Sequence, residues 1–362
     1  MFKKVNAINS NYANNIKTGG KLMKRVSPYP FTAIVGQDAM KMALILNVIN
    51  PSLGGVLIKG EKGTAKSTAV RALAELLPNR KEVKGCRFHC NPNDSITYCE
   101  DCVQRVENGE KLESVEGKMR VVDLPVNATE DRVVGSLDIE HAIKYGKKKF
   151  ELGILAEANK NILYVDEINL LDDHVVDVLL DASAMGINTV EREGISYSHP
   201  SRFVLVGTMN PEEGDIRPQL LDRFGLSVSV EGESDFEKRV QVIKSRIEYE
   251  KDPDGFVNNY EEEQKALSKK ITDARIRLKD VTIGDDMLLL VAQIAIKLDV
   301  DGHRADISVI KTALTIAAFE GRNIVTKEDL KEAAKFVLPH RMRKRPFEEA
   351  GLDWEKIEDF FS

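Results

Sequence analysis

Several features that mark other protein classes are missing from this sequence. No apolar run reaches the roughly 18 residues that a membrane-spanning helix needs. The net charge is −6, so the chain lacks the overall positive field that attracts nucleic acid. The first 37 residues contain no Asp or Glu and carry six basic residues, but they are not Arg-rich as targeting peptides are. We therefore predict a disordered tail over residues 1–27 and a cytoplasmic protein, with an organelle address and the plastid stroma as the alternative.

Cysteine is also scarce, and all of it lies in one segment. The four cysteines follow the spacing C-x3-C-x8-C-x2-C: Cys86, Cys90, Cys99 and Cys102. A disulfide framework would be spread through a secreted chain, whereas bunched thiols indicate a tetrahedral metal site. We predict a structural Zn²⁺ site in a loop insertion at residues 86–102, with His89 as a substitute ligand. A redox switch, an iron–sulfur cluster and four reduced thiols stay open.

Short apolar segments alternate with helical patterns in the first two thirds of the chain. Residues 54–60, 161–171 and 201–211 are predicted strands, and a glycine-rich turn and an amphipathic helix follow the first. Strands of this kind form a buried parallel sheet covered by helices, which is an α/β fold. Residues 186–203 have Gly near one end of an alternating stretch and predict a β-hairpin. We place this α/β domain at residues 28–235.

The composition changes near residue 236. Residues 236–280 are charged and helical without a strand signal, and we predict a helical linker. Residues 281–362 contain three further helical segments, which predict an all-helical lid domain. Thr326 and Asp329 have the spacing of a capping box at the start of the third helix. The basic run at 340–345 is interpreted as a solvated helix end, with a nucleic-acid patch as the alternative.

The segment after the first strand resembles a phosphate-binding loop, G-x-x-x-x-G-K-[ST], with one substitution. The candidate nucleotide-binding residues are Gly60, Glu61, Lys62, Gly63, Thr64, Ala65, Lys66, Ser67 and Thr68. Backbone N–H groups and a helix N-terminus cradle phosphates in such a loop, the lysine neutralises their charge, and the hydroxyl binds Mg²⁺. Ala65 stands where glycine is usual. If its φ is negative, the methyl group costs little and no functional group is lost.

Acidic and polar side chains follow the other two predicted strands. Asp166 and Glu167 end one strand, where the first can hold the Mg²⁺ shell and the second can polarise an attacking water. Asn210 ends the other strand and could position the same water. Hydrolysis also needs positive charge on the departing phosphoryl group, and the candidates are Arg217, Arg223 and Arg304.

In this order, these motifs resemble the AAA+ ATPases. The stretches "NATEDRVVGSLDIEHAI", "NPEEGDIRPQLLDRFGLSV" and "VDGHRADISVIKTA" are similar to the small ATPase subunits of magnesium chelatase, over roughly residues 28–350. The resemblance implies an AAA+ P-loop NTPase core with a parallel sheet, β-hairpin insertions and a helical lid. It implies an ATPase with ATP and Mg²⁺ as cofactors. Its role would be to drive insertion of Mg²⁺ into protoporphyrin IX, with cobalt or nickel insertion into a related tetrapyrrole as the near alternative.

The resemblance also implies residue roles and partners. Lys66 and Ser67 match Walker A, Asp166 and Glu167 match Walker B, and Asn210 matches sensor 1. Arg223 matches the finger that acts on a neighbour's nucleotide, with Arg217 as the fallback, and Arg304 matches sensor 2. Hairpins at residues 127–153 and 186–203 would couple nucleotide state to a partner. The partners implied are a homo-oligomeric ring, expected to be a hexamer, an integrin-domain ATPase-like subunit and a large tetrapyrrole-binding subunit.

Two other functions remain as alternatives. A remodelling chaperone of the MoxR group would pair with a von Willebrand-type protein, but residues 210–226 and the segment 236–280 are closer to the chelatase pattern. A helicase-like ATPase would need basic hairpin tips that grip phosphates. The hairpin stretch "GINTVEREGIS" has one Arg and two Glu, which disfavours nucleic acid, whereas "YGKKKFELG" at 145–153 is basic.

Overall fold

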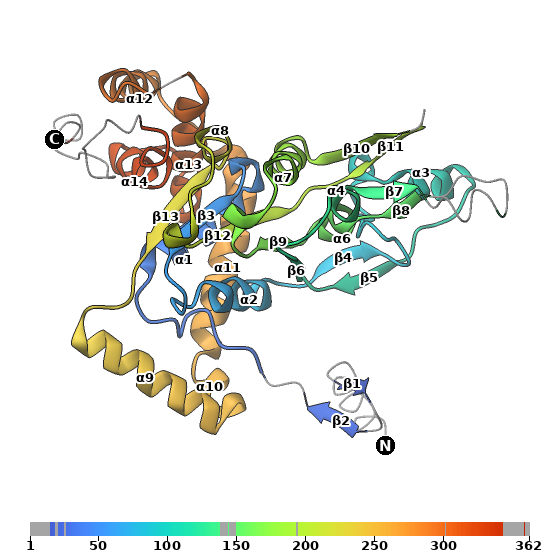
Figure 1. Cartoon of the computed structure of the whole chain (residues 1–362), viewed down its shortest axis with the longest axis horizontal. Coiled ribbons are helices and arrows are strands. Elements are labelled where there is room, and N and C mark those ends of the chain that lie inside the picture. Colours follow the sequence, from blue (N-terminus) through green and yellow to red (C-terminus); the bar gives the residue numbers. More distant parts are fainter. Residues whose placement is uncertain are drawn as a thin grey trace.

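The computed structural model describes most of the 362 residues. They are residues 15–18, 21–24, 27–137, 144, 150–192, 195–300, 302–342 and 358. A five-stranded sheet lies at the centre of this part of the chain, with helices on both faces and hairpins at one end (Figure 1). The α/β fold predicted from the alternating apolar segments is confirmed.

The central sheet is parallel throughout and has the order β13-β3-β12-β9-β6. Its strands are β3 (Val56–Gly60), β6 (Val121–Leu124), β9 (Ile162–Val165), β12 (Val204–Met209) and β13 (Leu226–Val230). Because Val206 of β12 pairs with Val56 on one side and with Tyr164 on the other, β3, β12 and β9 are neighbours in register. Their carboxyl ends therefore meet at one edge of the sheet.

The two faces of the sheet are covered by different helices. Alternate strand residues such as Ile58, Ile162 and Val206 share one core with helices of the first face. Leu57, Leu163 and their equivalents point to a second core. The helices of the first face are α1 (Asp38–Ile49) and α2 (Lys66–Leu76). Those of the second are α4 (Glu130–Val134), α6 (Ile154–Ala158), α7 (Asp173–Met185) and α8 (Pro218–Leu221).

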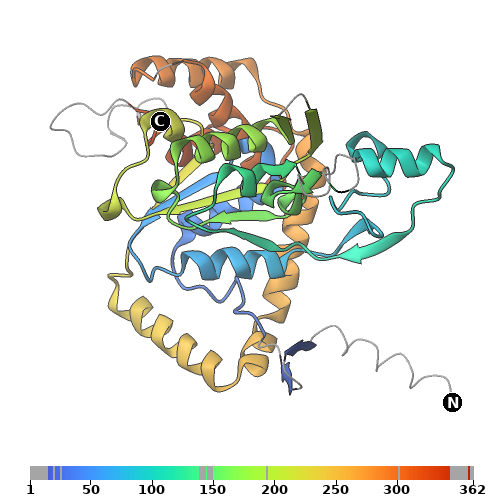
Figure 2. The ribbon, with the colours of Figure 1, turned by 45° about the vertical axis from the view of Figure 1, so that its right-hand side comes forward.

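Three insertions extend from one end of the sheet (Figures 1 and 2). The first pairs β4 (Arg80–Val83) with β5 (Ser114–Gly117) and contains the cysteines and α3 (Glu100–Glu107). The second pairs β7 (Gly135–Leu137) with β8 (Phe150–Leu152), and the third pairs β10 (Ile187–Arg192) with β11 (Ile195–Pro200). The hairpin predicted at 186–203 is confirmed. Of the one predicted at 127–153, residues 138–143 and 145–149 lie outside the described residues.

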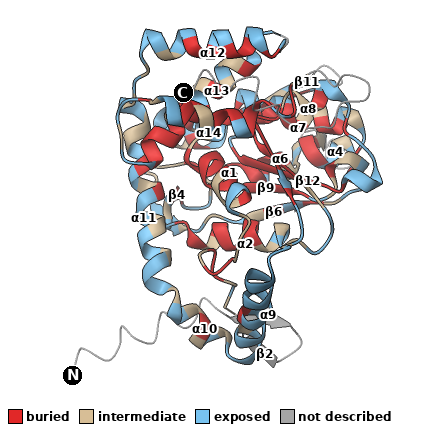
Figure 3. Ribbon diagram, turned by 90° about the vertical axis from the view of Figure 1, so that its left-hand side faces the viewer, coloured by how far each residue is buried: buried red, intermediate tan, exposed pale blue. Residues whose placement is uncertain are grey.

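The C-terminal part of the described chain is helical. It comprises α9 (Phe236–Lys251), α10 (Pro253–Asn259), α11 (Glu261–Arg277), α12 (Asp285–Lys297), α13 (Arg304–Phe319) and α14 (Lys327–Val337). The predicted capping box of Thr326 and Asp329 is present at the start of α14. Helix α9 extends from the core and is exposed along most of its length (Figure 3), whereas α11 buries Ile271 and Ala274 in the main core. The segment predicted as a linker therefore contributes to the core.

Two residues of the basic run fasten the lid to the sheet, which corrects the interpretation of a solvated helix end. Arg341 is 8% exposed and donates hydrogen bonds to the carbonyl oxygens of Phe224 and Gly225, 2.6 and 3.2 Å away. It also reaches the Asp222 carboxylate at 3.2 Å, and His340 Nε2 donates to the Phe224 carbonyl at 3.0 Å. Residues 343–345 lie outside the described residues.

The N-terminal segment differs in part from its prediction. Within the tail predicted to be disordered, β1 (Asn15–Thr18) pairs antiparallel with β2 (Lys21–Lys24). The other residues up to 26 lie outside the described part of the chain. None of the described helices is long and apolar enough to cross a membrane.

Candidate nucleotide-binding site

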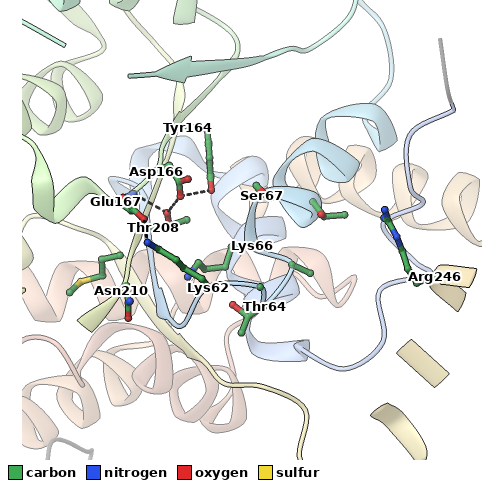
Figure 4. Close-up of a pocket in the computed structure, with 14 residues that line it drawn as sticks. Lys62, Thr64, Lys66, Ser67, Tyr164, Asp166, Glu167, Thr208, Asn210 and Arg246 are labelled. Atoms are coloured by element: carbon green, nitrogen blue, oxygen red, sulfur yellow. Dashed lines mark hydrogen bonds and ion pairs between the residues drawn. The ribbon is translucent and has the colours of Figure 1, made fainter. Parts of the chain in front are cut away.

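One pocket of about 470 Å³ lies at the carboxyl ends of β3, β9 and β12 (Figure 4). The glycine-rich loop supplies one wall and the strand ends supply the other. The lining residues are Lys62, Gly63, Thr64, Ala65, Lys66, Ser67, Thr68, Tyr164, Asp166, Glu167, Thr208, Met209, Asn210 and Arg246. The structure thus brings together the loop, both acids and the asparagine that the sequence placed in one site.

The loop is shaped by two glycines and its lysine. A Cβ atom on Gly60 would lie 2.1 Å from the Val230 carbonyl oxygen, so a side chain cannot fit there. Gly63 has φ +87°, which L-residues rarely adopt. Lys66 Nζ donates to the carbonyl oxygens of Gly60 and Glu61, the latter at 3.0 Å. Burial lowers the pKa of Lys66, while the Asp166 and Glu167 carboxylates oppose this.

Ala65 does not have the negative φ on which its low cost depended. It lies at φ 59° and ψ 19°, the left-handed region, directly before the first residue of α2. A Cβ atom in this region crowds the following carbonyl group and costs about 1–2 kcal/mol. Glycine is usual at this position because it adopts the same backbone without that cost. The loop keeps its shape with alanine, at the expense of local strain.

Asp166 is oriented by two hydroxyl groups that the sequence interpretation did not include. Tyr164 Oη donates to Asp166 Oδ1 at 3.0 Å, and Thr208 Oγ1 donates to the same oxygen at 2.6 Å. Burial raises the pKa of Tyr164, so its phenol keeps the proton that it donates. No hydrogen bond or ion pair among the described residues engages Oδ2. This leaves one carboxylate oxygen for a cation.

Glu167 is held at the opposite side of the same strand end. Its φ of 51° is again left-handed, and such backbone strain in a non-glycine residue is concentrated at functional sites. Its N–H donates to Thr208 Oγ1 at 3.3 Å. Lys62 Nζ lies 3.2 Å from a Glu167 carboxylate oxygen (Figure 4). The same nitrogen lies 2.6 Å from a carboxylate oxygen of Glu213. Glu213 is a further acid near the pocket that sequence reasoning missed.

Arg246 reaches the pocket from α9, and no local pattern pointed to it. It also lines an adjoining cavity of about 230 Å³ whose apolar side chains include Tyr29, Ile34, Val35 and Val242. The two cavities share Gly63, Thr64, Ala65 and Thr68 of the loop. A flat apolar group attached to a phosphate chain would fit across both.

The three candidate arginines lie outside the residues that line this pocket. Arg223 pairs with Asp177 and Asp181 of α7 at 2.9 and 2.8 Å. Arg217 pairs with Asp173 of the same helix at 2.5 Å.

Arg304 begins α13, as predicted, and its Nη1 lies 3.0 Å from Asp222 Oδ2. Its side chain is therefore paired with the residue that follows α8, and it does not line the pocket of its own subunit.

The donor set of the pocket fits Mg-ATP. The start of α2 presents backbone N–H groups to the pocket, Lys66 supplies a cation, and Ser67 and Asp166 supply the oxygen ligands that Mg²⁺ prefers.

The cysteines form a second cluster within the first insertion, between β4 and β5. Their four Sγ atoms all lie within 4.8 Å of one another, Cys86 and Cys99 being 3.7 Å apart, and none is in a disulfide. Cys90, Cys99 and Cys102 are buried. His89 is not one of the four clustered residues, and its Nδ1 lies 3.0 Å from Glu82 Oε2. The cluster therefore offers four thiols without it, and His89 as a substitute ligand stays a prediction.

Comparison with known sequences places these features in context. A family of AAA domains (dynein-related subfamily) matches residues 105–224, and a family of AAA lid domains matches residues 289–360. The magnesium-chelatase subunit ChlI homolog of Methanocaldococcus jannaschii is 58% identical over 334 residues, covering 92% of this chain and 91% of that protein. The magnesium-chelatase subunit ChlI of Synechocystis sp. is 51% identical, covering 91% of this chain and 93% of that protein.

Solved structures give the same fold. A cryo-EM-based structure of the complex between subunits BchI and BchD of magnesium chelatase matches with 43% identity and a TM-score of 0.53. The match covers 93% of this chain and all of the matched one. A crystal structure of an ATPase from Cytophaga hutchinsonii has a TM-score of 0.56 over 91% of this chain and 89% of its own. At 17% identity, this second likeness concerns the fold alone.

Replacing Ala65 by glycine tests the strain in the loop. Ala65→Gly relieves the left-handed cost but adds unfolded-chain entropy, so we expect the free energy of unfolding to stay unchanged or rise by up to about 1 kcal/mol. Ala292→Gly, at an exposed interior position of α12, should lower it by about 1 kcal/mol. Urea unfolding of both variants measures the contrast. Equal destabilisation would contradict a left-handed Ala65.

Proposed function

The chain belongs to the magnesium-chelatase subunit ChlI family of AAA+ ATPases, and from this premise we propose that it is the ATP-hydrolysing motor subunit of a metal chelatase. In this proposal hydrolysis drives insertion of Mg²⁺ into protoporphyrin IX, which a larger partner subunit carries out. The observation that supports it most is the meeting of Lys66, Asp166, Glu167 and Asn210 in one pocket. Relatives named as a chelatase subunit or its homolog are 58% and 51% identical over nine tenths of the chain, which supports magnesium and protoporphyrin IX as the substrates of the complex.

Seven of the side chains that line the pocket have a role in the proposed phosphoryl transfer. Lys66 neutralises phosphate charge, and Ser67 and Asp166 hold Mg²⁺, which when bound stabilises charge on the phosphate oxygens. Glu167 orients and polarises the attacking water, and Asn210 positions that water from the end of β12. Tyr164 and Thr208 position Asp166 through the hydrogen bonds to its Oδ1.

Arg223 and Arg304 are proposed to act on the nucleotide of a neighbouring subunit. Neither lines the pocket of its own chain. Arg223 is paired with acids of α7, and Arg304 is paired with Asp222, which follows α8. A positive side chain that completes a site in trans makes hydrolysis depend on assembly. Arg217 is kept as the fallback finger.

The proposed assembly follows from the same family. The matched solved complex contains two kinds of subunit, BchI and BchD, which supports a partner of the integrin-domain ATPase-like type. We further propose a homo-oligomeric ring, a hexamer, and a large tetrapyrrole-binding subunit. A cytoplasmic location remains our prediction, and the relative from Chlamydomonas reinhardtii, 50% identical over 95% of this chain, is named chloroplastic.

The alternatives carry less support. A MoxR-like chaperone or a helicase-like ATPase would have the same pocket, but the relatives matched over more than nine tenths of the chain are named as chelatase subunits or a homolog of one. Insertion of cobalt or nickel in place of magnesium would use the same motor residues, so the pocket does not distinguish the metal that is inserted.

Zn²⁺ is proposed as the occupant of the cysteine cluster. Tetrahedral zinc with Zn–S bonds of about 2.3 Å needs sulfur atoms about 3.8 Å apart. The observed separations, all within 4.8 Å, are close to this before any cation draws the thiolates inward. The site would be structural, because four cysteines leave no open coordination position.

Glu167→Gln tests the hydrolytic role. The amide cannot act as a base, so ATP should bind while turnover falls by about 100-fold or more. ATP binding and phosphate release are the two measurements. Glu213→Gln is the matched control, because Glu213 pairs with the same Lys62 but has no assigned role in activating water. Rapid turnover by Glu167→Gln would remove Glu167 from its role.

Mixing two inactive variants tests the trans arginine. Glu167→Gln keeps an intact Arg223, and Arg223→Ala keeps an intact Glu167, so mixed rings contain some complete sites. We expect each variant alone to be inactive and the mixture to regain ATP turnover. A mixture of Glu167→Gln with Lys66→Ala has no complete site and should stay inactive. No recovery in the first mixture would assign Arg223 to its own nucleotide.

Metal analysis tests the cysteine site. We expect about one zinc per chain by plasma mass spectrometry, and loss of that zinc in Cys99→Ser and Cys102→Ser. Iron with sulfide in the elemental analysis indicates a cluster. Thiol titration before and after reduction detects disulfides, which indicate a redox switch, and four free thiols without metal contradict the proposal.

A further inference from the structure

A second cavity lies at the opposite end of the strands that form the nucleotide pocket. It has a volume of about 640 Å³ and lies at the amino ends of β9 and β12. Its walls come from the end of α1 and the turn η2 (Pro51–Leu53), the last turn of α7, and α11. Because strands β9 and β12 lie between them, the two cavities are separate sites.

Four cationic side chains line this cavity: Arg80, Lys160, Arg202 and Arg275. No Asp or Glu is among its lining residues. Arg275 is anchored, with Nε and Nη2 donating to the Val48 carbonyl at 3.1 and 2.9 Å. Arg80 is also anchored, by Asn161 at 2.9 Å and Glu82 at 2.8 Å. Lys160 and Arg202 have no hydrogen bond or ion pair from their side chains within the described part of the chain.

The positive charge exceeds the negative charge around it. Helices α1 and α7 both end at the cavity, and each contributes about half a negative charge. Glu82 offsets Arg80. The Asp94 carboxylate also acts on Lys160 and opposes the lowering of its pKa. About one positive charge remains without compensation, which is costly in a partly buried cavity.

The pKa values of the same groups are consistent with this excess. Burial lowers the pKa of Lys160, and the Arg202 charge lowers it further. Burial likewise lowers the pKa of Arg275, with a contribution from Arg80.

A buried hydroxyl group in the cavity has no partner. Ser183 is 9% exposed, and its Oγ makes no hydrogen bond. It lies in the last turn of α7 among the lining residues. A buried hydroxyl without a partner costs free energy, and an oxyanion that enters the cavity would accept its hydrogen bond.

We propose that this cavity binds a small oxyanion of the phosphate class, either free or as the phosphate tail of a nucleotide. Lys160 and Arg202 supply charge, Ser183 supplies a hydroxyl donor, and Arg80 and Arg275 supply the fixed positive surroundings. The site goes beyond the proposed motor function, since none of its residues lines the nucleotide pocket.

Calorimetric titration with inorganic phosphate and with pyrophosphate tests the proposal. Lys66→Ala is the background in every sample, because it weakens phosphate binding at the nucleotide loop. We expect saturable binding in the background protein and at least a tenfold loss of affinity on adding Lys160→Ala with Arg202→Ala. The matched control adds Lys297→Ala with Lys327→Ala, two exposed lysines of the lid, and should bind as the background does.

A second variant and a second probe sharpen the result. Ser183→Ala removes no charge and should weaken phosphate binding by a few fold, provided that circular dichroism and thermal unfolding match the background. If ADP binds tightly, is displaced by phosphate and no longer binds when Lys160→Ala and Arg202→Ala are added, that result identifies the ligand of the cavity as the phosphate tail of a nucleotide. Phosphate saturation without ADP binding assigns a free oxyanion.

Three outcomes would overturn the proposal. One is the absence of phosphate and pyrophosphate binding at about 10 mM, far weaker than ordinary ligand affinities. Another is equal affinity in the background and in the Lys160 and Arg202 double change. The third is a smaller oligomer caused by that double change without any anion binding, which would assign the cations to an interface between copies.

Discussion

Parallel pairing of β3, β12 and β9 is the constraint on which the site depends. Val206 of β12 is in register with Val56 and Tyr164, so the three strands end together. The chain leaves β3 into the phosphate loop, β9 into Asp166 and Glu167, and β12 into Asn210. Groups more than 100 residues apart in the sequence therefore meet in one pocket. The buried faces of these strands, which fill two separate cores, keep that register fixed.

The sequence was sufficient to predict which residues meet in the pocket where these residues directly follow a strand or belong to the loop motif. Lys66, Asp166, Glu167 and Asn210 could be predicted because apolar segments and a loop motif placed them at one edge. Tyr164 and Thr208 were missed, although each lies two residues before a predicted site residue and so shares its side of the strand. Arg246 was beyond prediction, since its helix reaches the pocket only through tertiary structure. The sign of φ at Ala65 was undetermined because local sequence does not fix a single backbone angle.

The attachment of the lid shows how tertiary partners change the meaning of a charge pattern. A run of basic residues is solvated in most helices, yet Arg341 is buried where α8 ends. Its partners are four carbonyl oxygens and the Asp222 carboxylate, and burial without them would cost several kcal/mol. Arg304 pairs with the other oxygen of that carboxylate. Asp222 thus binds two arginines of the lid, Arg341 and Arg304, and is followed directly by Arg223. Movement of the lid and of these candidate arginines therefore cannot be independent.

The loop that carries the cysteine cluster is connected to the β7–β8 and β10–β11 hairpins by packing contacts and hydrogen bonds. Phe88, in the same loop, is fully buried beside Ala156 and its ring centroid lies 5.1 Å from that of His199 on β11. The Asn159 side-chain amide donates to the Phe88 carbonyl oxygen. The Asn188 side-chain amide of β10 donates to the carbonyl oxygen of Val134, the residue directly before β7. Phe150 of β8 stacks on Tyr197 of β11 at 4.4 Å. Close-packed contacts of this kind transmit displacement, because such interiors have little free volume. A metal that fixes the loop would therefore also fix the parts of both hairpins that pack around it.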